Sequence, residues 1–149
     1  MVQLKYHHNK KVGTLFGQLI GSAIATAPGF ELIDTLIPIP IRASKLNSRG
    51  FNQSQVIASG IQSVWYKPID STSLKKRSWA SSQTKKNRSD RLVNLPDLFV
   101  LNNAAQIKGK NILLIDDVLT TGATLEAAVH CLMTGYPKSI SIAVAAYTL

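Results

Sequence analysis

A strand-like run that leads into two carboxylates and a threonine–glycine loop carries the residues best suited to chemistry. Residues 112–125 read Ile-Leu-Leu-Ile-Asp-Asp-Val-Leu-Thr-Thr-Gly-Ala-Thr-Leu. The first four are apolar, which is typical of a strand buried on both faces of a parallel sheet. Asp116 and Asp117 lie where that strand is expected to end, and an apolar helical pattern begins at Leu125. The predicted order is therefore strand, acid pair, hydroxyl-rich loop and helix.

Each part of this stretch favours a different piece of one ligand. Ligands of open α/β sheets bind beyond the carboxyl ends of the strands, where a helix N-terminus attracts an anion such as phosphate. Gly122 lets the backbone approach the ligand, and Thr120, Thr121 and Thr124 add hydroxyl donors. The carboxylates would repel a phosphate, so they are expected to face sugar hydroxyls or a magnesium-bound group. A ribose 5-phosphate has this layout, whereas a plain βα turn with a solvated acid pair is the alternative.

The same stretch resembles the phosphoribosyl-pyrophosphate motif of type I phosphoribosyltransferases, in which a hydrophobic strand precedes two acids, two variable positions and Thr-Thr-Gly-x-Thr. The resemblance implies that Asp116 and Asp117, the catalytic candidates, hold the 2′- and 3′-hydroxyls of the ribose. It implies Mg²⁺ as the cofactor, with no direct metal ligand from the protein. The residues that it places around the 5′-phosphate are Thr120, Thr121, Gly122, Ala123 and Thr124.

Length and composition are those of one globular domain. The chain has 149 residues, of which 45% are hydrophobic and 17% charged, so a single domain over 1–149 is predicted. No apolar run approaches the roughly 18 residues that span a membrane, and no signal-peptide pattern opens the chain. The single cysteine, Cys131, excludes an intramolecular disulfide and a Cys-x-x-Cys zinc site. We expect a cytoplasmic protein without a membrane partner.

Positive charge is concentrated between Arg42 and Arg91. The formal net charge is +9, and this segment holds eleven lysines or arginines against two acids, Asp70 and Asp90. Anionic small molecules and nucleic acid are both suitable partners for such a segment. A basic surface without a specific partner is the alternative.

Apolar periodicity and breakers predict the remaining elements. Residues 10–27 have the pattern of an amphipathic helix, on which Gly13, Gly17 and Gly21 recur on another face and allow a close neighbour. The fold class that follows is α/β, a mainly parallel sheet of about five strands with helices on both faces. The other predicted elements are a strand at 30–37, a basic loop at 41–49, a helix over about 50–64, short strands within 71–79 and at 98–101, a helix at 125–134 and a strand at 139–148.

A second resemblance narrows the family. The run Pro-Ile-Pro at 38–40, a basic loop, and Arg-Gly-Phe-Asn-Gln at 49–53 are similar to the ComF/GntX family, the competence-protein-F branch of phosphoribosyltransferase-like proteins. In type I phosphoribosyltransferases the loop after this strand holds the pyrophosphate. The resemblance therefore makes Arg42, Lys45 and Arg49 the pyrophosphate-binding candidates, against the alternative of a solvated basic loop.

The polar and basic segment 78–91 shows no apolar periodicity. By position it corresponds to the mobile loop that closes over the active site of related enzymes and excludes water. An ordinary surface loop is the alternative. The loop candidates are Gln83, Lys85, Lys86, Arg88 and Arg91.

The chain also departs from the family pattern. Longer members carry an N-terminal four-cysteine zinc module, which is not expected here, and the hood that selects the nucleobase is reduced to 1–10 and 65–80. Two functions stay open. One is an enzyme that binds phosphoribosyl pyrophosphate with Mg²⁺ and transfers ribosyl phosphate to a nitrogen nucleophile. The other is a non-catalytic ligand-sensing module that binds single-stranded DNA or a competence protein during DNA uptake. A homodimer is left open under both.

Overall fold

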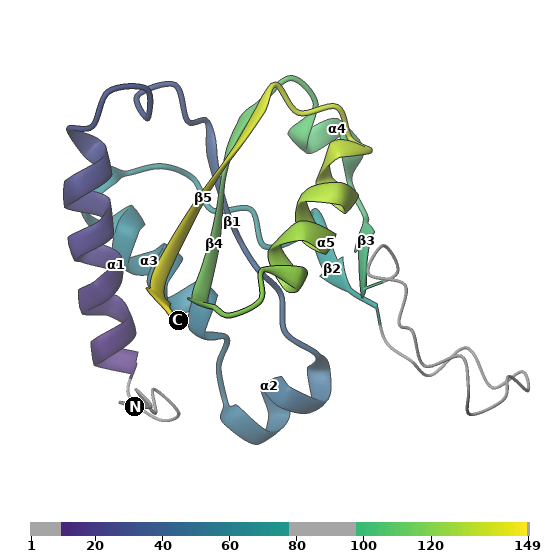
Figure 1. Ribbon diagram of the computed structural model, residues 1–149, viewed down its shortest axis with the longest axis horizontal. Coiled ribbons are helices and arrows are strands. Elements are labelled where there is room, and N and C mark those ends of the chain that lie inside the picture. The colour runs from purple at the N-terminus through teal and green to yellow at the C-terminus, as the bar shows by residue number, and fades with distance from the viewer. Residues whose placement is uncertain (1–9, 78–97, 149) are drawn as a thin grey trace, which may run out of the picture.

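The computed structural model describes residues 10–77 and 98–148. Figure 1 shows a central sheet with helices on both of its faces and a short helix beyond the carboxyl ends of its strands. In chain order the elements are α1 (Lys10–Ala25), β1 (Thr35–Pro38), α2 (Ala43–Arg49), α3 (Gln53–Trp65), β2 (Leu74–Lys76), β3 (Phe99–Leu101), α4 (Ala104–Ile107), β4 (Asn111–Leu119), α5 (Ala123–Met133) and β5 (Ser139–Tyr147).

The central sheet is parallel and has the strand order β1-β4-β5. β4 pairs with β1 from Thr35 opposite Ile112 onward, and with β5 from Asn111 opposite Ser139 onward. β2 and β3 form a separate antiparallel pair. The predicted α/β class is confirmed, with the described strands divided between a parallel sheet and this antiparallel pair.

β4 is buried on both faces, and its side chains alternate between two cores. Ile112 and Leu114 belong to the core that includes α5, whereas Leu113 and Ile115 belong to the core formed with α3. Figure 1 shows α1 and α3 on one side of the sheet and α5 on the other. Burial on both sides is why this strand is a continuous apolar run rather than an alternating one.

α1 packs against α3 through the predicted glycine face. Gly17 and Gly21 are the buried residues of α1. A Cβ atom on Gly17 would lie 2.8 Å from the Cα atom of Gly60 on α3, closer than real Cβ contacts allow. Close packing of these glycines against a neighbour is therefore confirmed, and α3 is that neighbour.

The strand predicted at 30–37 begins later than expected. Its first half forms turns, in which the Ile33 N–H donates to the Phe30 carbonyl at 3.0 Å. The Gly29 N–H also donates to the Glu31 side chain at 2.7 Å. These local bonds follow the Pro-Gly breaker and satisfy the backbone without a sheet partner, so β1 begins only at Thr35.

The basic segment predicted as a loop contains the helix α2. It ends at Gly50, whose φ of 77° is left-handed and whose N–H donates to the Leu46 carbonyl at 2.7 Å. None of its residues is buried, so the sequence lacks the apolar periodicity that would have revealed the helix.

The structure describes only part of the two segments that were expected to form the hood. Residues 1–9 lie outside the described part of the chain. Before β2, the Leu36 N–H of β1 donates to the Pro68 carbonyl at 2.8 Å, and the Asp70 N–H donates back to Leu36 at 2.9 Å. This segment therefore extends along the outer edge of β1. Within the described residues, no helix is long and apolar enough to cross a membrane.

Candidate functional site

Asp116 and Asp117 lie in the second half of β4, close to its carboxyl end at Leu119. Asp116 is buried, with 8% of its surface exposed, whereas Asp117 is half-buried. The Asp116 Oδ1 atom accepts from the Asp117 N–H at 2.9 Å and from the Ser54 hydroxyl at 3.0 Å. The Asp117 Oδ1 atom accepts from the Val118 N–H at 3.0 Å. Both acids are thus fixed at the carboxyl end of the strand, by bonds from neighbouring N–H groups and, for Asp116, by the hydroxyl of the distant Ser54.

Burial has a clear effect on the first acid. Burial, followed by the negative charge of Asp117, raises the pKa of Asp116 to about 6. The hydrogen bonds from the Asp117 N–H and the Ser54 hydroxyl act in the opposite direction. The charged form of Asp116 is therefore destabilised in the folded protein, and a cation or a hydroxyl donor in front of this carboxylate would stabilise it.

The hydroxyl-rich loop leads directly into α5. Gly122 caps the helix with a left-handed φ of 79°, and its carbonyl accepts from the Glu126 N–H at 2.9 Å. A small hollow opens at this helix start, lined among others by Thr120, Gly122, Thr124 and Asp116. The free N–H groups of a helix start suit a phosphate. The structure thus brings the predicted phosphate-binding loop next to the first acid.

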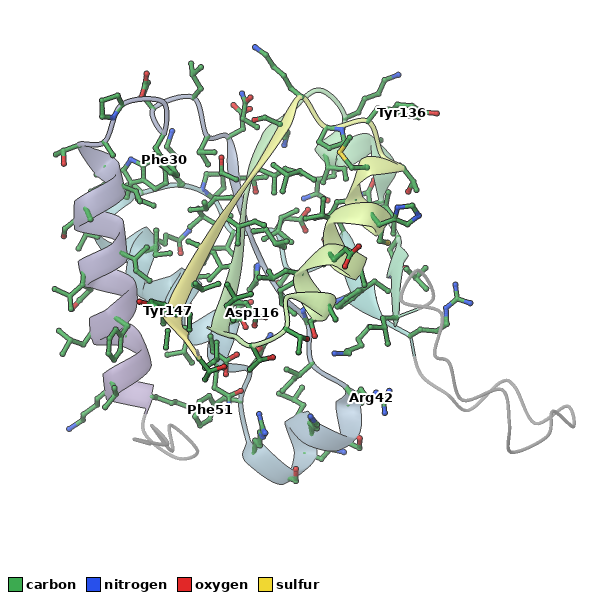
Figure 2. The ribbon with its side chains drawn as sticks, viewed as in Figure 1. Phe30, Arg42, Phe51, Asp116, Tyr136 and Tyr147 are labelled. Carbon is green, nitrogen blue, oxygen red and sulfur yellow. The ribbon has the colours of Figure 1, made fainter. Side chains whose placement is uncertain are left out.

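A polar cavity of about 460 Å³, called here the main cavity, joins the acid pair to the basic helix. Its volume lies in the range of small-molecule sites. Arg42, Lys45 and Arg49 line it together with Asp116 and Asp117. Figure 2 shows Asp116 toward the carboxyl end of β4 and Arg42 beside α2 beyond it. The predicted pyrophosphate candidates and the predicted ribose candidates therefore share one cavity.

Lys76 is a cavity residue that the sequence argument missed. It lies at the end of β2, half-buried, and its Nζ atom is 5.3 Å from the centre of the Phe99 ring. Burial, followed by the positive charges of Arg42 and Lys45, lowers the pKa of Lys76, while Asp116 opposes this effect. The only sequence feature that could have indicated Lys76 is its spacing. It lies two residues after the buried Leu74, so both side chains are on the same face of the short strand β2.

An apolar hollow adjoins the main cavity. It is lined by the side chains of Phe16, Phe51 and Ala145, among others. Gln53 and Asp117 line both the hollow and the main cavity. The carboxylate of Asp117 therefore separates a charged space from an apolar one. Neither the hollow nor Gln53 had been assigned from the sequence.

The predicted loop residues cannot be placed in this site. Gln83, Lys85, Lys86, Arg88 and Arg91 lie outside the described residues. Their assignment as parts of a closing loop stays a prediction.

Several solved structures share the fold of this chain. Purine phosphoribosyltransferase from Pyrococcus horikoshii superposes with a TM-score of 0.51 at 17% identity, over 87% of this chain and 71% of that one. Hypoxanthine phosphoribosyl transferase of Trypanosoma cruzi gives a TM-score of 0.57 at 13% identity, over 93% and 75%. Glutamine phosphoribosylpyrophosphate amidotransferase from B. subtilis gives 0.56 at 15%, over 90% and 26%. The fold is that of type I phosphoribosyltransferases.

Sequence comparison then gives the family. Residues 3–148 match the phosphoribosyl transferase domain. Competence protein ComFC of Bacillus subtilis is 35% identical over 114 residues, which is 76% of this chain and 43% of that protein. DNA utilization protein YhgH of Escherichia coli (strain K12) is 23% identical over 143 residues, with 94% and 62% covered. The chain belongs to the phosphoribosyl transferase domain family, in its ComF branch, and spans less than two thirds of the length of these relatives.

Proposed function

We propose that the chain binds phosphoribosyl pyrophosphate with Mg²⁺ in the main cavity and transfers the ribosyl phosphate to a nitrogen nucleophile. One observation carries the proposal. Two carboxylates from β4 and four cations, three of them on or beside α2 and one on β2, line the same cavity. A hydroxyl-lined helix start adjoins it. A ligand with a sugar between two phosphate groups presents the matching chemistry at each point.

In this arrangement the ribose hydroxyls donate to Asp116 and Asp117. The 5′-phosphate lies in the hollow at the start of α5, and the pyrophosphate lies against the cations of the main cavity. The carboxylate oxygens at the cavity edge are compatible with Mg²⁺ held by the oxygens of the ligand and by water. When bound, Mg²⁺ would neutralise charge on the departing pyrophosphate.

The protein would accelerate transfer by positioning and electrostatics. The bond from C1′ to the pyrophosphate oxygen breaks, and that oxygen leaves with the electron pair. The nitrogen forms the new bond to C1′ and loses its proton to solvent. Positive charge that develops on the ribose lies near Asp116 and Asp117, while negative charge on the leaving group lies near Arg42, Lys45 and Lys76. Each charge thus meets its opposite.

The apolar hollow beside Asp117 is too small to hold a nucleophile such as a heteroaromatic base. Its walls include two phenylalanines, and its volume of about 20 Å³ admits about one water molecule. The class of the nitrogen nucleophile is therefore decided by the panel of compounds in the experiment that follows.

The test measures pyrophosphate release and melting temperature with phosphoribosyl pyrophosphate, Mg²⁺ and a panel of ammonium, glutamine and heteroaromatic bases. At about 100 times the Kd, binding contributes about 2.7 kcal/mol, which raises the Tm by about 5–10 °C. Release that requires both Mg²⁺ and one nucleophile would support transfer. A Tm that does not move would contradict binding. A Tm that rises without release from any nucleophile would contradict transfer and favour ligand sensing.

A non-catalytic module that binds single-stranded DNA or a protein of DNA uptake is the second candidate. The formal net charge of +9 favours it. So do the names of the relatives, a competence protein and a DNA utilization protein. Fluorescence anisotropy with labelled single-stranded DNA at several salt concentrations tests it. Four or five phosphate contacts would give a log–log salt slope near about −3. Competition by pyrophosphate would place the DNA on the same cations.

Lys76→Ala should weaken pyrophosphate binding by about 10–100-fold, because it removes one charge-assisted hydrogen bond from a half-buried place. Lys75→Ala is the matched control. Its ammonium is exposed and donates to the Ser71 carbonyl at 2.9 Å, away from the cavity, so a change below about twofold is expected. Isothermal titration with pyrophosphate and Mg²⁺ measures both. Equal losses in the two variants would show that Lys76 acts only through overall charge.

A further inference from the structure

We propose that Ser54 is a positioning residue that sets the direction of the Asp116 carboxylate, and that Asn52 ties this bond to the base of the pyrophosphate segment. The inference rests on the proposed function, since it concerns how the same cavity holds phosphoribosyl pyrophosphate. Neither residue was selected from the sequence as part of the site. Three hydrogen bonds carry the argument.

The first two bonds fix the Asn52 side chain at the start of α3. Its Oδ1 atom accepts from the Ser54 N–H at 3.2 Å, which caps the helix. Its Nδ2 atom donates to the Ile39 carbonyl at 2.9 Å. One bond requires the amide oxygen and the other requires the amide nitrogen, so only one orientation of the side chain satisfies both. Asn52 is therefore a rigid link between α3 and the residue that follows β1.

The hydrogen bond between Asn52 and Ile39 also holds together the two ends of the segment that contains α2. Ile39 and Asn52 flank the segment 40–51, which carries α2 and its cations. The bond between them closes the base of this segment. Arg42, Lys45 and Arg49 therefore project from a loop whose two ends are joined at one side-chain amide. Movement of the cations relative to α3 is restricted at that point.

The third bond connects this base to the acid pair. The Ser54 hydroxyl donates to the Asp116 Oδ1 atom at 3.0 Å across 62 residues of sequence. Both side chains are buried, with Ser54 2% and Asp116 8% exposed. A buried hydroxyl beside a buried carboxylate is stabilising only when the two are paired, because each alone would lose its hydration.

Asp116 cannot turn freely once these donors are in place. Its Oδ1 atom is held from two sides, by Ser54 and by the Asp117 N–H at 2.9 Å. The same side chain lines the main cavity. Fixing one oxygen from behind sets the direction in which the rest of the carboxylate meets a ribose hydroxyl. Ser54 also stabilises the ionised form of Asp116, because its bond lowers the pKa that burial and Asp117 raise.

The test compares Ser54→Ala with Ser59→Ala, an exposed serine of the same helix whose hydroxyl donates to the Gln55 carbonyl at 3.0 Å. Affinities for phosphoribosyl pyrophosphate and for pyrophosphate alone, each with Mg²⁺, are measured from pH 5 to 8. For Ser54→Ala we expect about 5–20-fold weaker binding of phosphoribosyl pyrophosphate and less than about twofold change for pyrophosphate. The pH at which binding of the sugar ligand falls should also move upward. Ser59→Ala should change neither affinity.

Two results would overturn the positioning role. One is a Ser54→Ala protein that binds phosphoribosyl pyrophosphate like the wild type with the same pH profile. The other is an equal loss for both ligands, which would show a general loss of structure. A wild type that binds pyrophosphate but no phosphoribosyl pyrophosphate would instead overturn the proposed function, and this role with it. An NMR titration of the Asp116 carboxyl without ligand gives a separate readout, in which Ser54→Ala should raise its pKa.

Discussion

The double change Asp116→Asn with Asp117→Asn is expected to weaken binding of phosphoribosyl pyrophosphate with Mg²⁺ by at least about 100-fold. Each carboxylate would accept a ribose hydroxyl, and a hydrogen bond to a charged group contributes about 1.5–3 kcal/mol. Two such losses exceed the 2.7 kcal/mol that corresponds to a factor of about 100. The asparagine Oδ1 atoms can still accept the hydrogen bonds that the Ser54 hydroxyl and the Val118 N–H donate, so the fold should survive. Titration calorimetry and the ligand-induced shift in Tm measure the loss.

Replacing Asp116 should weaken ligand binding but should stabilise the protein when no ligand is present. The pKa of Asp116 rises from 3.8 to about 6 on folding, so the folded chain binds a proton more tightly than the unfolded chain. Ionisation of this group therefore opposes folding, and its penalty develops as the pH rises through this window. Asp116→Asn should increase the free energy of unfolding by roughly 1–3 kcal/mol above pH 6 and by little below pH 4. Urea unfolding at pH 4 and pH 7.5 measures this difference.

Asp34→Asn provides the control at the other end of the sheet. The Asp34 carboxylate accepts from the Asn111 N–H at 2.8 Å, and its bonds to Asn111 hold its pKa below the usual range. Its replacement should leave ligand affinity unchanged and should not stabilise the protein. Greater stability together with lost binding is the signature of a functional acid. An Asp116 and Asp117 variant that loses stability, or that retains the full ligand-induced shift, would contradict the assigned role.

The acid pair and its loop could be predicted because their signals are local. A run of four apolar residues, two acids and a threonine–glycine loop follow one another within the stretch 112–125. Burial on both faces removes the alternation from β4, and the residues at its end then stand out. The same reasoning located α1, α3, α5 and β5 to within a few residues. Each has either strong periodicity or clear breakers at its ends.

The places of Ser54 behind Asp116 and of Lys76 in the main cavity could not be predicted, because they depend on contacts between distant segments. Ser54 is an ordinary helix-start residue until folding brings Asp116 to its hydroxyl. Lys76 is one of three adjacent cations. It differs from the exposed Lys75 only because successive side chains of β2 point to opposite faces of the strand. The helix α2 was missed for a different reason, since it has no buried face. Its ending at Gly50 was the only local clue.

The glycine repeat of α1 was a local signal whose partner the sequence did not show. The structure supplies that partner in α3, where the backbones of the two helices meet. A Cβ on Gly17 would contact the Ile57 carbonyl oxygen and lie 2.8 Å from the Gly60 Cα. A Cβ on Gly60 would lie 2.9 Å from the Gly17 Cα. These neighbours are backbone atoms, which cannot move aside as a flexible side chain can.

Gly17→Ala is therefore expected to lower the free energy of unfolding by about 2–3 kcal/mol, although alanine favours the helix by about 1 kcal/mol. The helices must separate to admit the methyl group, and the core between α3 and β4 loosens with them. For a chain of this size the Tm should fall by about 5–10 °C. Gly13→Ala is the matched control on the same helix, because its methyl group would meet only the Val56 side chain, at 3.0 Å from Cγ1. That variant should lie within about 1 kcal/mol of the wild type. Urea unfolding of both proteins decides the matter, and equal stability of the two variants would mean that the glycine contact does not set the distance between α1 and α3.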